Sequence, residues 1–125
     1  MTEREAAHAV PSDPDDVFSA ISNSRRRQVL LSLAQSDCTL AAGDLAVEIA
    51  AIECLVEPSK VTSKQRTRIY VPLTQSHLPK LAEAGLIEYD ERGKKVSPTA
   101  ATKPVANHIR RLETSCYTPE DEDEQ

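Results

Sequence analysis

The stretch from Ser63 to Ala84 has the hydrophobic spacing of a helix with one apolar face. The residues on that face are three to five positions apart: Ile69, Leu73, Leu78 and Leu81. Pro72 and Pro79 interrupt the pattern, because a proline inside a helix removes a hydrogen bond and clashes with the preceding turn. The pattern predicts a helix over about 64–84 and leaves open whether it is one kinked helix or two.

A glycine stop and a hairpin follow this helix. Gly85 stands where helices end in a left-handed residue, a conformation that glycine adopts without a steric penalty. The residues from Leu86 to Tyr89 favour extended structure, and Arg92-Gly93 supplies a turn. We therefore expect a β-hairpin over about 86–98.

The rest of the chain predicts four more helices and one short strand. Ser12–Asp16 combines a capping residue, a proline and acids, which is typical of a helix start, and Ser22–Ser24 separates the first two helices and offers a cap. The expected helices span about 14–21, 24–35 and 41–54, with a last one after Thr99 that ends near Leu112. An extended piece lies at 38–40 and a linker at 55–63. The predicted class is mainly α with a small β-hairpin, ordered helix, helix, strand, helix, helix, strand, strand, helix. The expected inward residues of the first three helices are Val17, Phe18, Ile21, Val29, Leu30, Leu33, Ala34, Leu45, Ile49 and Ile52.

The last helix is amphipathic. Val105, Ile109 and Leu112 lie at i, i+4 and i+7, and Pro104 suits its first turn. This helix has little left to cover in its own domain, so we expect it to pair with its copy in a second subunit. The expected assembly is a homodimer with these three residues at the interface, and the helix at 14–21 is a further candidate element.

Three phrases of the sequence resemble a known domain family. They are Ser-Arg-Arg-Arg-Gln-Val-Leu at 24–30, Asp-Leu-Ala at 44–46 and His-Leu-Pro-Lys-Leu-Ala-Glu-Ala-Gly-Leu-Ile at 77–87. Together they resemble the ArsR-type winged helix-turn-helix, and the stretch 68–90 is most similar to small haloarchaeal winged-helix domains of unassigned role. The resemblance covers about 16–112.

The resemblance implies a winged helix-turn-helix domain over 14–112 that binds DNA. In that family the helix before the Ala-Gly-Leu phrase is the recognition element and the hairpin is the wing. The metal-binding cysteine motif of many ArsR repressors is absent, since residues 41–53 contain no Cys or His. The resemblance therefore does not imply metal sensing.

Charge is distributed unevenly along the chain. The net charge is −5 and the pI about 5.2, yet residues 17–112 hold fourteen bases and nine acids, a net of +5. Residues 1–16 carry a net of −4 and residues 113–125 a net of −6. Binding to phosphate depends on local patches, so the middle remains suited to nucleic acid. The ends, 1–13 and 113–125, are expected to be disordered solvating segments; competition with DNA and adaptation to high salt are the alternatives.

Composition argues against several other classes. No apolar run approaches the roughly 20 residues of a membrane helix, and the N-terminus lacks a signal-peptide pattern, so we expect a cytoplasmic protein. Cys38, Cys54 and Cys116 lack metal-ligand spacing and are odd in number, which predicts free structural thiols, with a redox switch as the alternative. With three glycines, no phosphate-binding loop and isolated histidines, we expect no enzyme, no cofactor and no metal.

The expected recognition helix offers hydrogen-bonding groups suited to a major groove. Gln75 suits adenine, and Arg66 or Arg68 suits guanine or phosphate. The remaining candidates on this helix are Lys64, Thr74, Ser76, His77 and Lys80. A solvated helix face is the alternative, and for His77 a packed or capping role.

Two further basic segments are candidates for backbone contacts. Arg92, Lys94 and Lys95 at the hairpin turn suit phosphates or the minor groove, and the alternative is a solubilising tip. The run Arg25–Arg27 suits phosphate near a helix N-terminus. Its alternative is a solvated face or internal pairing with Asp15, Asp16 or the acidic tails.

Two functional hypotheses follow. The first is a DNA-binding transcriptional regulator that acts as a winged-helix homodimer on double-stranded DNA, with the recognition helix in the major groove and the wing on the backbone. The second is a winged-helix protein-interaction module that does not bind DNA, suggested by the acidic ends and the 55–63 linker. A positive stripe over 64–77 and the hairpin favours the first, and an apolar patch there favours the second.

Overall fold

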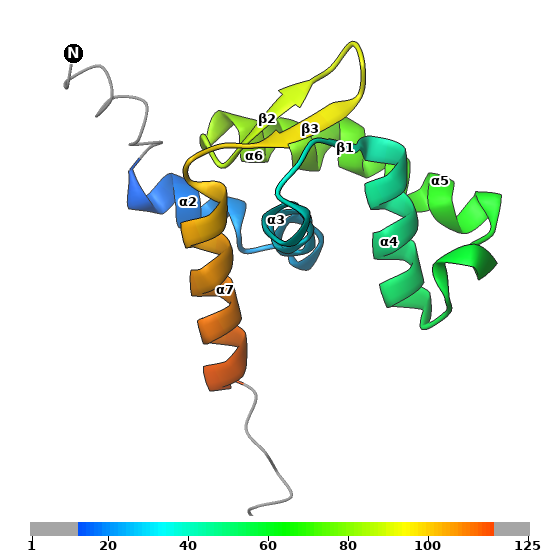
Figure 1. The fold of residues 1–125 in the computed structure, drawn as a ribbon, viewed down its shortest axis with the longest axis horizontal. Helices are drawn as coiled ribbons and strands as arrows, with labels where there is room; N and C mark the ends of the chain where they lie inside the picture. Colours follow the sequence, from blue (N-terminus) through cyan, green and yellow to red (C-terminus); the bar gives the residue numbers. More distant parts are fainter. Residues whose placement is uncertain (1–12, 117–125) are drawn as a thin grey trace, which may run out of the picture.

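The computed structural model describes residues 13–116 of the chain. Its elements are α2 (Pro14–Ala20), α3 (Ser24–Ser36), β1 (Leu40–Ala41), α4 (Ala42–Cys54), η1 (Pro58–Lys60), α5 (Ser63–Pro72), η2 (Leu73–His77), α6 (Leu78–Glu83), β2 (Ile87–Asp90), β3 (Lys95–Pro98) and α7 (Thr102–Cys116). Figure 1 shows a mainly helical protein with one small sheet, which confirms the predicted class. Expectations about the terminal segments 1–12 and 117–125 lie outside the described residues.

The sheet has three antiparallel strands in the order β1-β3-β2. β2 and β3 form the predicted hairpin, with Ile87 opposite Pro98 and Asp90 opposite Lys95. β1 adds two residues at the other edge, where Leu40 pairs with Val96. The Ala42 N–H donates to the Lys94 carbonyl at 2.9 Å, so the start of α4 is bound to the turn end of the hairpin.

Side-chain caps fix where three of the helices begin. Asp13 accepts from the Asp16 N–H ahead of Pro14, and Asn23 accepts from the first backbone N–H groups of α3, so both predicted starts are confirmed. Thr62 and Gln65 form a reciprocal capping box at α5, with bonds of 2.9 and 3.1 Å.

The region 63–83 is one continuous helical path with a π-helical turn in its middle. Pro72 is the last residue of α5, and Pro79 lies in the first turn of α6. Between them, the Leu78 N–H donates to the Leu73 carbonyl five residues back. A wider turn relieves the ring clash and the missing donors that two prolines impose on an α-helix. The question of one helix or two is thereby answered: the segments are joined without a break.

Gly85 ends this helical path as expected. Its φ is 79°, the left-handed region. The Gly85 N–H donates to the Ala82 carbonyl at 2.9 Å and the Leu86 N–H to the Leu81 carbonyl at 3.0 Å, which is the bond pair of a Schellman motif. The chain leaves the motif directly into β2.

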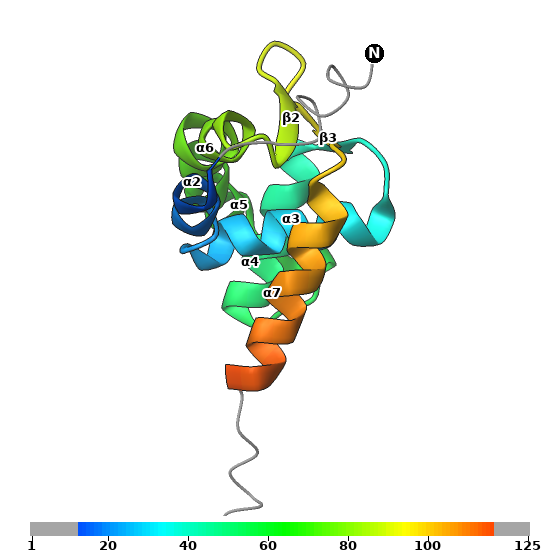
Figure 2. The same cartoon turned by 90° about the vertical axis from the view of Figure 1, so that its left-hand side faces the viewer.

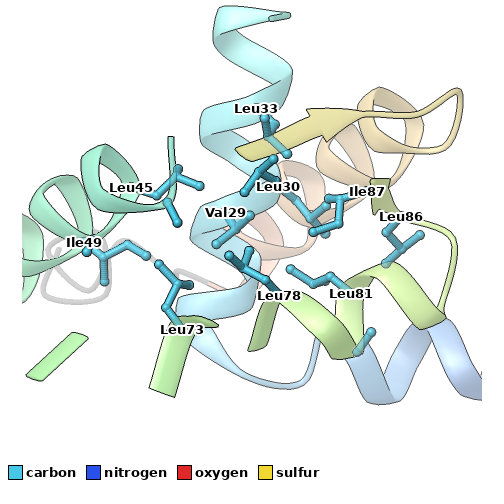
Figure 3. Close-up of a cluster of buried hydrophobic side chains, with 14 of the residues drawn as sticks. Val29, Leu30, Leu33, Leu45, Ile49, Leu73, Leu78, Leu81, Leu86 and Ile87 are labelled. Carbon is cyan, nitrogen blue, oxygen red and sulfur yellow. The ribbon is translucent and has the colours of Figure 1, made fainter. Parts of the chain in front are cut away.

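The core surrounds α3, which lies between α4, α6, the hairpin and α7 (Figures 1 and 2). Val29, Leu30 and Leu33 of α3 are fully buried, as are Leu73, Leu78 and Leu81 of the long helix, and Ile69 is nearly so. Figure 3 shows these apolar side chains gathered with those of α4 and β2. The predicted inward faces of both helices are therefore confirmed.

Two expected core residues are exposed instead. Phe18 is 58% exposed and Ile52 is 50% exposed, while Ala34 is only partly buried. The prediction was wrong for Phe18 because α2 has only seven residues and buries Ala20 and Ile21 rather than its middle. It was wrong for Ile52 because this side chain lines a groove that is open to solvent.

Helix α7 differs from its prediction in length and in role. It continues four residues past Leu112, to Cys116, so the predicted domain boundary at 112 and the expected disorder at 113–116 are wrong. It packs against α3, and Thr102, Ala106 and Ile109 are buried in its own domain. The expectation that α7 has little to cover is therefore wrong. Ile109 serves this core, Val105 is partly buried against it, and Leu112 is 47% exposed.

Within residues 13–116, no helix combines the length and the apolar character that crossing a bilayer requires.

Candidate nucleic-acid interface

One face of α5 and η2 is exposed to solvent and consists mainly of polar and basic side chains. We call Lys64, Arg68, Val71 and Gln75 the exposed stripe, since they lie at i, i+4, i+7 and i+11 and all are exposed. Ser76 is exposed beside it. Among the candidates predicted on this helix, Lys64, Arg68, Gln75 and Ser76 are therefore accessible to a ligand.

The stripe lies in a segment without acids. Residues 58–82 contain five bases and no Asp or Glu, in a chain with twenty acidic residues. The nearest acids in sequence, Glu57 and Glu83, bound the segment at its two ends. The segment that contains α5 and η2 therefore has a net charge of +5 although the whole protein is negative.

Arg66 packs against the protein. Its guanidinium lies over the Tyr70 ring, 5.1 Å from the centroid. It also covers the start of α4, where a Cβ added to Gly43 would lie 3.1 Å from Arg66 Nη2. Gly43 therefore leaves room for Arg66, and the pair helps to join α5 to α4. The separation of Arg66 and Gly43 in the sequence gives no indication of this contact.

Thr74 and Lys80 are also partly buried. The Thr74 hydroxyl donates to the Tyr70 carbonyl at 3.0 Å, next to the turn that Pro72 disturbs. Lys80 lines a hollow between α2 and α6 together with Asp16 and Glu83. Both residues are less available to DNA than predicted.

His77 faces the core side of the molecule. Its Nδ1 lies 3.1 Å from Arg26 Nη1, so the neutral ring accepts the guanidinium N–H in the tautomer with Nδ1 free. Burial lowers the pKa of His77, and the charges of Arg26 and Arg25 lower it further. The structure thus places His77 in the packed role that was its alternative to base reading.

The arginine run Arg25–Arg27 is used within the molecule. Arg25 binds Glu53 through two N–H···O contacts of 2.7 and 2.9 Å. Arg26 also donates to the Ala20 carbonyl at 2.6 Å, and Arg27 to the Ile21 carbonyl at 2.9 Å. Arg27 Nε further lies 3.9 Å from Glu113. Internal pairing was one of the predicted alternatives. The partners lie on α4, η2, α7 and at the end of α2 rather than at Asp15 or Asp16, and Glu113 belongs to the stretch predicted as the acidic tail.

The hairpin tip presents its three basic residues to solvent. Arg92, Lys94 and Lys95 are exposed, and Lys94 has a positive φ of 54°. The Asp90 carboxylate accepts from the Arg92 N–H at 3.1 Å, and a Cβ on Gly93 would lie 2.8 Å from the same carboxylate. Asp90 and Glu91 reduce the net charge of this tip, and Asp90 fixes its shape.

Tyr89 of β2 was not predicted as a site residue. Its hydroxyl oxygen is buried and has no hydrogen-bond partner among the described residues. Burial raises the pKa of this hydroxyl, and the nearby Lys94 ammonium partly offsets the effect. The nearby Tyr70 of α5 also raises this pKa.

All three cysteines are free and exposed. The prediction that they are free is therefore confirmed for Cys38, Cys54 and Cys116, and none of the three is part of the buried core. Cys54 is the last residue of α4 and Cys116 the last residue of α7.

Comparison with known proteins gives one positive result. No curated protein and no solved structure shows significant similarity to the chain. Residues 18–97 match the model of a domain of unknown function, DUF7344. The matched region runs from α2 to β3 and stops before α7. Because it covers more than half of the chain, the protein belongs to the DUF7344 family.

Proposed function

We propose that this protein is a DNA-binding transcriptional regulator of the winged helix-turn-helix type. In this proposal α5, η2 and α6 form the recognition helix, which enters the major groove. The β2–β3 hairpin is the wing and lies along the phosphate backbone.

The observation that carries the proposal is the exposed stripe within a segment free of acids. Lys64 and Arg68 are exposed and form no ion pair with residues 13–116. Gln75 continues the same face with an amide that suits adenine. Two cations without an ion-pair partner and one amide on the same helical face can bind the phosphates and base edges of a duplex. Most other basic residues of the domain contact partners within the protein.

The position of the hairpin in the chain and its charge also support the proposed DNA binding. It follows the helix directly after Gly85, and Arg92, Lys94 and Lys95 project from its tip. The Ala42 N–H donates to the Lys94 carbonyl, so the turn of the hairpin is tied to the start of α4.

The proposed regulator acts as a homodimer, since two copies related by a two-fold axis read two half-sites. Of the three interface residues predicted on α7, Leu112 is the one with a largely exposed side chain. The dimer contact is therefore assigned to the last turns of α7 rather than to its middle.

The second candidate is a protein-interaction module without DNA binding. Val71, which is 42% exposed in the centre of the stripe, favours it. A single apolar side chain among cations and amides makes a small patch, so DNA remains the better-supported ligand.

The test is a titration of the purified chain with a fluorescent mixed-sequence DNA duplex at several salt concentrations. Binding is expected to weaken steeply, with a log–log slope of roughly −0.9 per phosphate neutralised. The double variant Lys64→Ala, Arg68→Ala is expected to bind more weakly and to lower the slope by about 2.

Lys103→Ala is the matched control, because this lysine lies on α7 and pairs with Asp37 at 3.1 Å. It is expected to leave affinity and slope unchanged. Absence of salt-sensitive binding to any duplex would overturn the proposal, and equal losses in the stripe and control variants would remove Lys64 and Arg68 from the interface.

A further inference from the structure

A hollow of about 380 Å³ opens where α2, the start of α3 and the second half of α7 meet. Figure 2 looks at this side of the molecule. Four of the lining residues are apolar and lie in or directly after α2 and in α7: Phe18, Ile21, Ile109 and Leu112. Small-molecule sites in proteins occupy roughly 300–1,000 Å³ and have mainly apolar walls with a few polar groups. The hollow therefore has the size and the lining of a small-molecule site.

The apolar wall is only partly covered by the protein itself. Ile21 and Ile109 are buried, whereas Phe18 is 58% exposed and Leu112 is 47% exposed. Because all four line the same hollow, an apolar group that enters it rests on the two buried side chains and removes part of the two exposed ones from water. This wall favours a ligand with a branched aliphatic or an aromatic side chain.

Two charged residues line the same hollow. Arg27 of α3 and Glu113 of α7 approach each other to 3.9 Å, measured from Nε to the carboxylate, which is longer than a hydrogen bond. Arg27 donates from Nη1 to the Ile21 carbonyl at 2.9 Å. Among residues 13–116, the side chain of Arg27 forms no other hydrogen bond and that of Glu113 forms none. Guanidinium N–H groups and a carboxylate are therefore available side by side.

The two charges restrict the head group of the ligand. A simple carboxylate on Arg27 would lie beside the Glu113 carboxylate, and a simple amine on Glu113 would lie beside the Arg27 guanidinium, so each would meet a like charge. A group with one carboxylate and one ammonium binds each residue with the opposite charge. An α-amino acid holds these two groups on a single carbon, together with its side chain.

We infer that the hollow is a binding site for an α-amino acid with a large apolar side chain, such as leucine. The carboxylate of the ligand binds Arg27 and its ammonium binds Glu113. Its side chain lies against the four apolar residues of the hollow. None of these residues belongs to the exposed stripe or to the hairpin, so the inference goes beyond the proposed DNA binding and does not depend on it.

Isothermal titration calorimetry of the purified chain with four compounds tests the assignment. L-Leucine carries all three groups, glycine lacks the apolar side chain, isocaproate lacks the ammonium and isoamylamine lacks the carboxylate. Leucine is expected to bind with a dissociation constant in the micromolar to millimolar range, as suits so small a ligand. Each of the other three compounds should bind more weakly by about ten-fold or more, because it leaves one part of the site unfilled.

Two results of this titration would contradict the inference. The first is the absence of saturable binding of both L-leucine and L-phenylalanine up to about 10 mM. The second is isocaproate that binds as tightly as leucine, because the ammonium would then contribute nothing.

Glu113→Gln separates the two head-group contacts. It is expected to weaken leucine binding by about ten-fold, yet to leave isocaproate binding equal or stronger because the like charge is gone. Arg27→Gln should weaken the binding of both compounds. Arg110→Gln is the matched control, since Arg110 is exposed on α7 and contacts Asn107 at 3.0 Å, and it should leave leucine binding unchanged. Equal losses for leucine and isocaproate in Glu113→Gln would remove the ammonium contact and with it the amino-acid assignment.

Cys116 reports where leucine binds. It lines the hollow, whereas the equally free and exposed Cys38 and Cys54 do not. Alkylation by N-ethylmaleimide, followed at each cysteine by peptide mass spectrometry, should become slower at Cys116 in saturating leucine and stay unchanged at the other two. Leucine binding without any change at Cys116 would place the ligand elsewhere and overturn the inference.

A second copy of the chain is the competing occupant, because the proposed homodimer also uses the turns around Leu112. Sedimentation equilibrium of the parent chain and of Phe18→Ala separates the two. If Phe18→Ala weakens self-association and the parent chain binds no leucine, the inference is overturned and the homodimer stands. If the parent chain binds leucine at one site and stays monomeric at tens of micromolar, the inference stands and the homodimer is removed. Salt-sensitive DNA binding is measured separately from both.

Discussion

The arginines of this protein divide into those with a fixed partner and those without one. Arg25, Arg26 and Arg27 hold Glu53, the end of α2 and His77 in place, whereas Arg68 has no partner among residues 13–116. Two of these partners, Glu53 and His77, are far away in sequence, at separations of 28 and 51 residues. Three adjacent arginines in the sequence are therefore mainly a structural feature, and the isolated Arg68 is the better candidate for a ligand contact.

Protonation of His77 should destabilise the fold. Its pKa in the folded protein lies below the ordinary 6.5, so the unfolded chain takes up a proton at higher pH than the folded chain. The free energy of unfolding is therefore expected to fall as the pH drops below about 6.5, and to level off below the folded-state pKa. Urea unfolding of the parent chain and of His77→Gln at a series of pH values checks this. The same pH dependence in both proteins would contradict the role assigned to His77.

Thr102 is a buried polar residue with two hydrogen bonds, one to the segment between α6 and β2 and one to the segment that leads into α7. Its hydroxyl donates to the Leu86 carbonyl at 2.7 Å and accepts from the Thr99 N–H at 2.8 Å. Thr102→Val keeps the shape and leaves both backbone groups unpaired, which should cost about 1–3 kcal/mol. Thr102→Ser keeps both bonds and should cost less. Chemical denaturation of the two variants measures the loss in the free energy of unfolding. Equal losses would show that packing, rather than hydrogen bonding, accounts for the contribution of Thr102.

Residue-level burial was predictable where it follows a helical period and unpredictable where it depends on neighbours in space. Leu30, Leu33 and Leu81 were correctly assigned from spacing alone. Thr102 was not identified, because its burial depends on a carbonyl sixteen residues away. Arg66 was misjudged for the same reason, since Tyr70 and Gly43 together determine its position.

At the level of elements, the helix starts and the glycine stop followed from local chemistry, and the π turn did not. Two prolines seven residues apart indicated a disturbance in 63–83, but sequence gave no basis for choosing a kink, a break or a wider turn. The observed turn keeps Leu73 and Leu78 on the core side despite the prolines. It therefore allows the exposed stripe and the apolar face to extend past Pro72.

Gly85 is expected to be required for the junction between α6 and β2. Alanine at φ 79° should cost about 1–2 kcal/mol, because a Cβ disfavours the left-handed conformation. Gly43→Ala is the control, since Gly43 lies in the first turn of α4 and has only the movable Arg66 side chain near it. Thermal unfolding should show the larger loss for Gly85→Ala. The reverse order would mean that the Arg66–Gly43 contact limits stability more than the Schellman motif does.

At the level of the whole molecule, acidic and basic charge are separated along the chain. Residues 117–125 contain five acids and no base, so a chain that ends at Cys116 changes from a net charge of −5 to 0. If the protein binds DNA as proposed, removing these acids should strengthen binding at low salt, and the gain should vanish at high salt where charges are screened. Replacing the five acids with their amides controls for chain length. A gain that is independent of salt would point to steric blocking instead.

The mainly helical class with a small β-hairpin was predicted, but the surface against which the last helix packs was not. The amphipathic pattern of 105–112 is real, but spacing shows only that a helix has an apolar side and cannot show which surface covers it. In the structure α3 covers most of this apolar side. The proposed homodimer contact is therefore limited to the turns around Leu112. The matched family region ends at residue 97, so the helix that completes this core lies outside that region.

The burial of Ile109 has a consequence for how the protein is made. During synthesis the chain from α2 to β3 leaves the ribosome first, and the side of α3 that α7 covers stays open until residues 102–109 have followed. A nascent chain that stops before Thr102 therefore presents an uncovered apolar surface, which chaperones and proteases recognise. The domain can therefore complete its core only after α7 has been synthesised.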